Sequence, residues 1–164
     1  MSCGCNETHV QMKEILIVKY GEVMLKGNNR PAFVNALIRN IKSALRGAGQ
    51  FQIHKGQSLL YVEPKGDTDL DLAAGRLRKV FGIIVFHRAL EIEKNLEEIK
   101  SRSLDYFAPI LNESRTFKIE SRRADKNFPY RSQDINNILG QLISDHFSHL
   151  KVDVHHPDVT LFVN

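Results

Sequence analysis

Residues 117–136 read FKIESRRADKNFPYRSQDIN. Phe117 and Ile119 alternate with polar residues, which predicts a strand. Ser132 is a good N-cap, and Asp134 would lie in the first turn of the helix that follows it. The loop between strand and helix holds aromatic side chains and four cations, Arg122, Arg123, Lys126 and Arg131. Cations beside exposed aromatic rings and a helix N-terminus are typical of a phosphate-binding surface. A solvated turn between two core elements is the alternative interpretation.

Basic residues gather in a second stretch far from this loop. Residues 19–46 hold six lysines and arginines against a single acid, Glu22, and residues 115–131 hold six against two acids. The net charge of the whole chain is only +4. Two basic stretches in a chain of modest net charge favour one composite surface for a polyanion. Scattered solubilising charge is the alternative.

The composition is that of a soluble globular protein. Of the 164 residues, 42% are hydrophobic and 26% are charged. No apolar run approaches the roughly 20 residues that a membrane helix needs, and the N-terminus lacks the apolar core of a signal peptide. We therefore expect a cytoplasmic protein with no membrane contact. Cys3 and Cys5 are too close for an unstrained disulfide and have too few neighbouring ligands for a metal, so both are predicted to be reduced thiols in a tail.

Hydrophobic spacing predicts a β-α-β-β-α-β first half. Its strands are expected at 14–20, 51–55, 59–62 and 83–92. The first helix should begin at Pro31, bury a face spaced four residues apart from Phe33 to Leu45, and end before Gly47. The second should begin near Asp67 or Thr68. This order is a split β-α-β arrangement, with helices on one face of a sheet.

The second half is predicted to hold two further helices and two strands. A helix over 96–111 should bury Ile110 among others, with Pro109 indicating a kinked or non-helical last turn. The remaining elements are expected at 116–121, 132–150 and 159–163. We divide the chain into a disordered tail (1–12), a first domain (13–92) and a second domain (93–164).

Two motifs carry a resemblance to a known family. The run RRADKNFP followed by SQDIN resembles the THUMP domain, an RNA-binding module of several tRNA-modifying enzymes, in the version found in tRNA 4-thiouridine synthetases (tRNA sulfurtransferases). Residues 15–33, ILIVKYGEVMLKGNNRPAF, are similar to the N-terminal ferredoxin-like domain that precedes THUMP in those synthetases. The resemblance covers nearly all of the chain from Glu14 onward.

The resemblance implies an α+β fold in which a ferredoxin-like βαββαβ sandwich precedes a THUMP α/β domain. THUMP domains continue with one more strand, so the chain is expected to be a fragment that ends before the domain is complete. The resemblance also implies that both modules grip the acceptor end of tRNA, including its 3′ CCA. A later domain would use ATP and Mg, receive sulfur from a cysteine desulfurase and, in some members, serve thiamine synthesis. The Ser-Gly-Gly-x-Asp-Ser phosphate loop of that domain is absent here, so no catalytic residue is assigned.

The candidate RNA-binding residues come from the two basic stretches. They are Lys26, Asn28, Arg30, Arg39, Arg122, Arg123, Lys126 and Arg131. No metal ligands and no bound cofactor are predicted within the chain, and a homodimer is left open. Three other functions remain: a stand-alone RNA-binding adaptor, the RNA-binding part of a THUMP methyltransferase, and a ferredoxin-like protein-interaction module without an RNA role.

Overall fold

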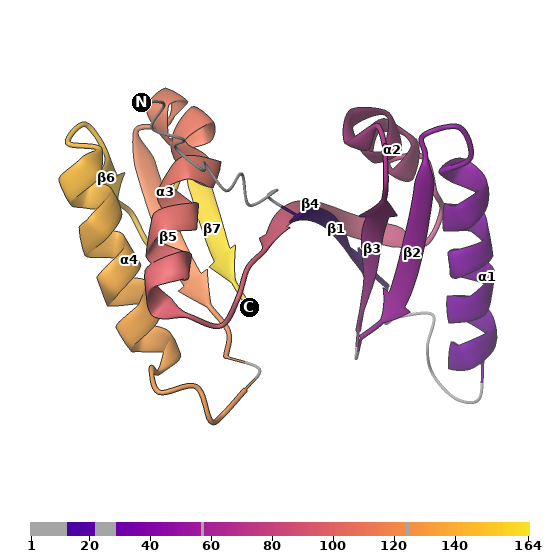
Figure 1. Cartoon of the computed structure of the whole chain (residues 1–164), viewed down its shortest axis with the longest axis horizontal. Helices are drawn as coiled ribbons and strands as arrows, with labels where there is room; N and C mark the ends of the chain where they lie inside the picture. The colour runs from indigo at the N-terminus through magenta and orange to yellow at the C-terminus, as the bar shows by residue number, and fades with distance from the viewer. Residues whose placement is uncertain (1–12, 22–28, 57, 124) are drawn as a thin grey trace, which may run out of the picture. The chain divides into compact units, whose positions relative to one another are not determined.

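The computed structural model describes residues 13–21, 29–56, 58–123 and 125–164. It divides into two compact units, Met1–Glu91 and Ile92–Asn164, coloured indigo to magenta and pink to yellow in Figure 1. Each unit is described by itself. The predicted tail and the candidate residues Lys26 and Asn28 lie outside the described residues.

Unit 1 is a four-stranded antiparallel sheet with two helices on one face (Figure 1). Its elements in chain order are β1 (Lys13–Tyr20), α1 (Arg30–Ala44), β2 (Gln50–Lys55), β3 (Leu59–Lys65), α2 (Leu70–Leu77) and β4 (Ile83–Glu91). The strand order is β2-β3-β1-β4, so each helix joins two strands that are consecutive in sequence but not adjacent in the sheet. The predicted ferredoxin-like fold is confirmed.

The core of unit 1 lies between the sheet and its helices. Leu16 and Val18 of β1 are fully buried against Leu37 and Ile41 of α1. Burying each such side chain contributes roughly 1.5–3 kcal/mol, so the predicted four-residue spacing of α1 is what fixes this helix to the sheet. The chain turns after α1 at Gly47, whose positive φ of 83° suits glycine.

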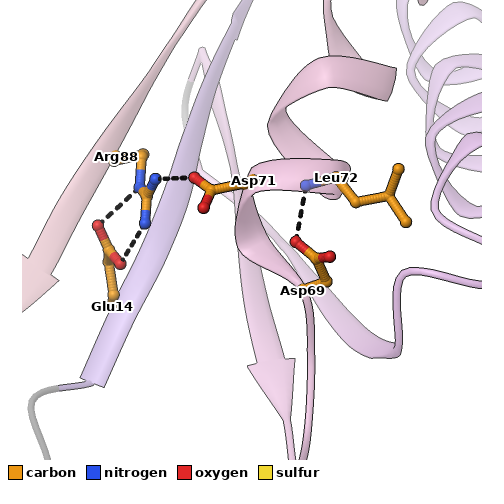
Figure 2. A network of polar contacts seen from close by, with 5 residues as sticks. All are labelled: Glu14, Asp69, Asp71, Leu72 and Arg88. Carbon is orange, nitrogen blue, oxygen red and sulfur yellow. Dashed lines mark hydrogen bonds and ion pairs between the residues drawn. The ribbon is translucent and has the colours of Figure 1, made fainter.

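The start of α2 is set by two aspartates (Figure 2). Asp69 is the N-cap, and its side chain accepts the N–H of Leu72 at 2.8 Å, so the helix begins later than the predicted Asp67 or Thr68. Asp71, in the first turn, accepts a hydrogen bond from Nη1 of Arg88 at 2.6 Å. Arg88 also donates from Nε and Nη2 to Glu14, each at 2.8 Å, which joins β4, β1 and α2. These interactions raise the pKa of Arg88 above its ordinary value, and the hydrogen bonds to Glu14 contribute most.

Unit 2 has a three-stranded parallel sheet with two helices on one face. Its elements are α3 (Leu96–Glu113), β5 (Thr116–Ser121), α4 (Ser132–His146), β6 (Lys151–Val152) and β7 (Val159–Val163), with β5 in the centre. Phe117 of β5, Leu111 of α3 and Ile143 of α4 are fully buried together. Partly buried side chains that pack against this core also come from both helices, so α3 and α4 share one core.

The structure differs from the predictions for unit 2 in several details. The last turn of α3 is helical and runs through Pro109 to Glu113, because Pro109 is exposed and water can satisfy the carbonyl that it leaves without a partner. Ile110 is 47% exposed and not in the core. Helix α4 ends at His146, although Leu150 is still buried by the turn that follows, and the short strand β6 was not predicted.

Candidate nucleic-acid interface

The basic loop between β5 and α4, residues 122–131, is anchored at its start by backbone hydrogen bonds. The N–H of Arg122 donates to the carbonyl of Val163 at 2.7 Å and so extends the ladder between β5 and β7. The N–H of Arg123 donates to Oγ of Ser132 at 3.2 Å, at the beginning of α4. The loop therefore leaves the sheet in a fixed direction.

Arg123 braces this loop from within. Its Nη1 donates to the carbonyls of Phe128 at 3.3 Å and Tyr130 at 3.5 Å, and the residue is half-buried. The rings of Phe128 and Tyr130, with centroids 5.8 Å apart, pack against the core of unit 2. The aromatic rings of this loop were predicted to be exposed, but Phe128 and Tyr130 are half-buried and hold the loop down rather than offering free stacking faces.

Three of the predicted cations project from the braced loop into solvent. Arg122, Lys126 and Arg131 are exposed, and no carboxylate among the described residues forms an ion pair with any of their side chains. Asp125, the one acid of this loop, is held by Nζ of Lys94 at 3.0 Å. The hydrogen bond from the N–H of Asn127 and, as a smaller contribution, the hydrogen bond from Lys94 lower the pKa of Asp125. The carboxylate of this loop is therefore already matched by another lysine.

The N-terminus of α4 differs from its prediction. Arg131, not Ser132, occupies the cap position, and the hydroxyl of Ser132 is used by Arg123. Oδ2 of Asp134 accepts the N–H of Arg131 at 2.9 Å. A carboxylate in the first turn already occupies the place that a phosphate would take at a helix N-terminus. The loop side chains, rather than this helix end, are the candidate phosphate ligands.

Unit 1 presents its own basic surface on α1. The helix contains no acidic residue. Arg30 and Arg39, the two candidate residues that it carries, are exposed, as are Lys42 and, just after the helix, Arg46. These cations belong to a different unit from the loop cations, so the composite surface stays a prediction.

Sequence reasoning missed the turn between α2 and β4. Arg78 and Lys79 are exposed there, and Phe81 is 77% exposed. They belong to the run RLRKVFG, whose cations close to an aromatic residue are a signal that could have identified this turn. Within the described residues no group of three histidine, cysteine or acidic side chains could hold a metal ion, and no helix there has the length and hydropathy of a membrane span.

Comparison with known proteins agrees with this two-unit organisation. Residues 15–86 match the ThiI ferredoxin-like domain, and residues 93–164 match the THUMP domain. The chain therefore contains a ThiI ferredoxin-like domain followed by a THUMP domain. A relative in Caldanaerobacter subterraneus subsp. tengcongensis, named "Probable tRNA sulfurtransferase", is 41% identical over 152 residues, which are 93% of this chain and 39% of that protein. A similarly named Staphylococcus aureus protein is 38% identical over 143 residues.

Solved structures of similar proteins have the same fold. The crystal structure of a 4-thiouridine synthetase–RNA complex with bound ATP matches with a TM-score of 0.77 and 33% identity, over 93% of this chain and 39% of that one. A protein from Pyrococcus horikoshii Ot3 matches equally well, with a TM-score of 0.77, 28% identity and 51% of its length covered. The chain thus spans about two fifths of the tRNA sulfurtransferase relatives that it matches.

Proposed function

We propose that this chain binds tRNA and positions it for thiolation by the remainder of a tRNA sulfurtransferase. The observation that carries the proposal is the braced loop of unit 2, which holds Arg122, Lys126 and Arg131 exposed and without ion pairs to the described residues. Exposed cations on a fixed support bind phosphates at low entropic cost, because their backbone is already ordered. The similar proteins supply the identity of the polyanion: the relatives are named for tRNA, and one was solved with RNA.

The chain would recognise the shape and charge of the tRNA rather than its base sequence. Lysine and arginine contacts to phosphates fix the orientation of a helical RNA without reading its bases. In the proposed arrangement, the cations of unit 2 and Arg30 and Arg39 of unit 1 hold the acceptor stem and its 3′ CCA end. The uridine to be thiolated would then be presented, elsewhere on the same tRNA, to a catalytic domain outside these residues.

The remaining steps of the proposal belong to the whole enzyme. ATP and Mg would activate the uridine in that catalytic domain, a cysteine desulfurase would supply the sulfur, and thiamine thiazole synthesis could draw on the same sulfur relay. The protein would work in the cytoplasm, where tRNA is modified, and a homodimer is compatible with the proposal. None of this chemistry is assigned to side chains of this chain.

A titration of the purified chain tests the proposal. Wild type, Arg122→Ala and Arg30→Ala are titrated with a tRNA acceptor mini-helix that carries or lacks the 3′ CCA, and circular dichroism checks folding. We expect each substitution to weaken binding by roughly 1 kcal/mol, somewhat below the value for a fully enclosed charged hydrogen bond. Removing the CCA should weaken it as well. Well-folded variants that bind as tightly as wild type, with no effect of the CCA, would contradict the proposed site.

A further inference from the structure

The charges of unit 1 are separated between the two ends of its sheet. All acidic residues that the structure describes in this unit lie at one end, which we call the acidic end: the first residues of β1, the last residues of β3 and β4, and the start of α2. They are Glu14, Glu63, Asp67, Asp69, Asp71 and Glu91. Cations of the strands pair with these acids. Lys13 binds Glu63 at 3.2 Å and Glu91 at 2.5 Å, and Arg88 is held by Glu14 and Asp71 (Figure 2).

The opposite end, which we call the basic end, carries cations and no acid among the described residues of the unit. It is formed by the ends of β1 and β2, the start of α1, and the turn from α2 to β4. Its cations are Lys19, Arg30, Lys55, Arg78 and Lys79. Backbone contacts bring these segments together: the N–H of Gly21 donates to the carbonyl of Gly82 at 3.4 Å, and Lys19 is the cross-strand partner of Val85.

Large apolar side chains are exposed at this same end. Phe81 is 77% exposed and Ile84 is 64% exposed. Ile84 is the extra residue of a β-bulge, because Lys19 pairs with Val85 whereas Tyr20 pairs with Ile83. The bulge therefore turns Ile84 out of the regular alternation at the beginning of β4, three residues after Phe81.

The backbone that carries Phe81 is held on both sides. Gly82 has a φ of 97°, and a Cβ there would lie 3.1 Å from Cζ of Phe33 on α1, so the turn packs closely against that helix. On the other side, the turn follows directly from α2, whose Leu77 is fully buried. An exposed ring on an ordered backbone loses little freedom when it binds a partner.

We propose that Phe81 is a stacking platform for an unpaired base of the RNA bound by this chain, with Lys79 and Arg78 contacting the flanking phosphates. The proposal rests on the proposed function and adds a subsite to it. An aromatic ring among cations is the arrangement that binds single-stranded nucleic acid, because bases stack on the ring while the cations follow the backbone. The cations that lie around the exposed ring favour a polyanion over an apolar protein surface.

The test compares two RNAs that differ in unpaired nucleotides. One is an acceptor mini-helix with its loop and its single-stranded 3′ end, and the other is a blunt duplex with the same stem. Phe81→Ala should lower the affinity for the mini-helix about tenfold and the affinity for the blunt duplex less than twofold, since only the first offers a base to stack. Phe81→Tyr, which keeps an aromatic face, should bind both RNAs within twofold of wild type.

Matched control variants lie at the acidic end of the same unit. Leu72→Ala removes an apolar side chain that is 39% exposed, and Lys65→Ala removes a lysine that pairs with Glu63. Neither should change the affinity for either RNA, whereas Lys79→Ala should weaken both severalfold and reduce the salt dependence. Circular dichroism and the midpoint of thermal unfolding establish that each variant is folded.

Each outcome is decisive. If folded Phe81→Ala binds the mini-helix as wild type does, or loses equal affinity for both RNAs, the stacking platform is wrong while tRNA binding stands. If wild type binds neither RNA, both the platform and the proposed function are wrong. If Phe81→Ala instead abolishes association with a protein and leaves RNA binding unchanged, the basic end is a protein-docking surface and the proposal is overturned.

Discussion

The Arg88 cluster at the acidic end of unit 1 and the 122–131 loop of unit 2 use arginine in opposite ways. At the acidic end, the guanidinium of Arg88 is enclosed by two carboxylates, and each of its three nitrogens donates to one of them. In the loop, Arg122 and Arg131 are exposed without a carboxylate partner among the described residues, and Arg123 donates to backbone carbonyls instead. A paired arginine stabilises the fold, whereas an unpaired one is available to a phosphate.

This difference shows why the number of basic residues in a segment is a poor guide to binding. A guanidinium already held by carboxylates would have to give up those interactions before it could bind a phosphate, and its charge is already neutralised. The loop has no such cost, since its single acid, Asp125, is occupied by Lys94. Partner geometry, rather than net charge, separates the two roles.

The largest expected effect follows from removing the unpaired cations together. The triple variant Arg122→Ala, Lys126→Ala, Arg131→Ala should bind tRNA about 100-fold more weakly at low salt, at roughly 1 kcal/mol for each exposed charged contact. The matched variant Lys13→Ala, Lys65→Ala, Arg88→Ala removes the same charge from the acidic end and should keep its affinity within about threefold. Fluorescence anisotropy titrations of the two variants measure this contrast. Equal losses in both would mean that binding depends on net charge alone.

Arg123→Ala should have an intermediate effect of a different kind. Losing the hydrogen bonds to Phe128 and Tyr130 should lower the free energy of unfolding by about 1 kcal/mol and loosen the loop. Affinity for tRNA should then fall severalfold, but the slope of affinity against salt should stay that of wild type, because a bracing residue makes no phosphate contact. Urea unfolding and salt titrations measure the two quantities. A reduced slope would show that Arg123 contacts the RNA directly.

Arg88→Ala should affect stability without affecting binding. Its side chain is 41% exposed, so solvent screening limits the loss to about 1 kcal/mol in the free energy of unfolding. The variant should bind tRNA as tightly as wild type does. Glu14→Gln should resemble it in unfolding experiments, since it removes the carboxylate that takes two of the hydrogen bonds. Weaker tRNA binding by folded Arg88→Ala would contradict the distinction between paired and unpaired arginines.

The smallest effect concerns acid stability in unit 2. Oδ2 of Asp158 accepts the N–H groups of Arg115 and Thr116, at 2.9 and 3.0 Å, and these hydrogen bonds lower the pKa of Asp158. Its contribution to stability is therefore present above the ordinary pKa of about 3.9 and is lost as the pH falls through the lower folded value. Thermal unfolding from pH 6 to pH 2 should show a shallower acid limb for Asp158→Asn. An identical limb in variant and wild type would exclude this coupling.

Hydrophobic spacing was sufficient to predict most of the fold. The four-residue spacing along α1 and the alternation in β5 each result from one buried face of the element. Because apolar residues recur wherever that face is buried, the spacing in the sequence is enough to predict both elements. The ends of the helices were predicted less accurately. Helix α3 tolerates Pro109 because that position is exposed, and α4 stops before the buried Leu150, so an apolar residue continued the pattern after the helix had ended.

The candidate site was predicted less fully than the fold. Arg122, Lys126 and Arg131 are exposed as expected, but the brace formed by Arg123 depends on where the loop returns the carbonyls of Phe128 and Tyr130. A side-chain bond to a backbone carbonyl leaves no signature in residue identity. The turn from α2 to β4 was missed for a similar reason: only the fold brings Arg78 and Lys79 to the same end of unit 1 as Lys19 and Arg30.

The salt dependence of tRNA binding tests the central claim most directly. Affinities of wild type and of the Arg122→Ala, Lys126→Ala, Arg131→Ala variant are measured from about 50 to 200 mM salt and plotted logarithmically. If the three cations each contact a phosphate, the slope for the variant should be shallower by about 2 to 3, at roughly 0.7–0.9 per contact. Equal slopes for the two proteins would show that the exposed cations of this loop do not touch the RNA.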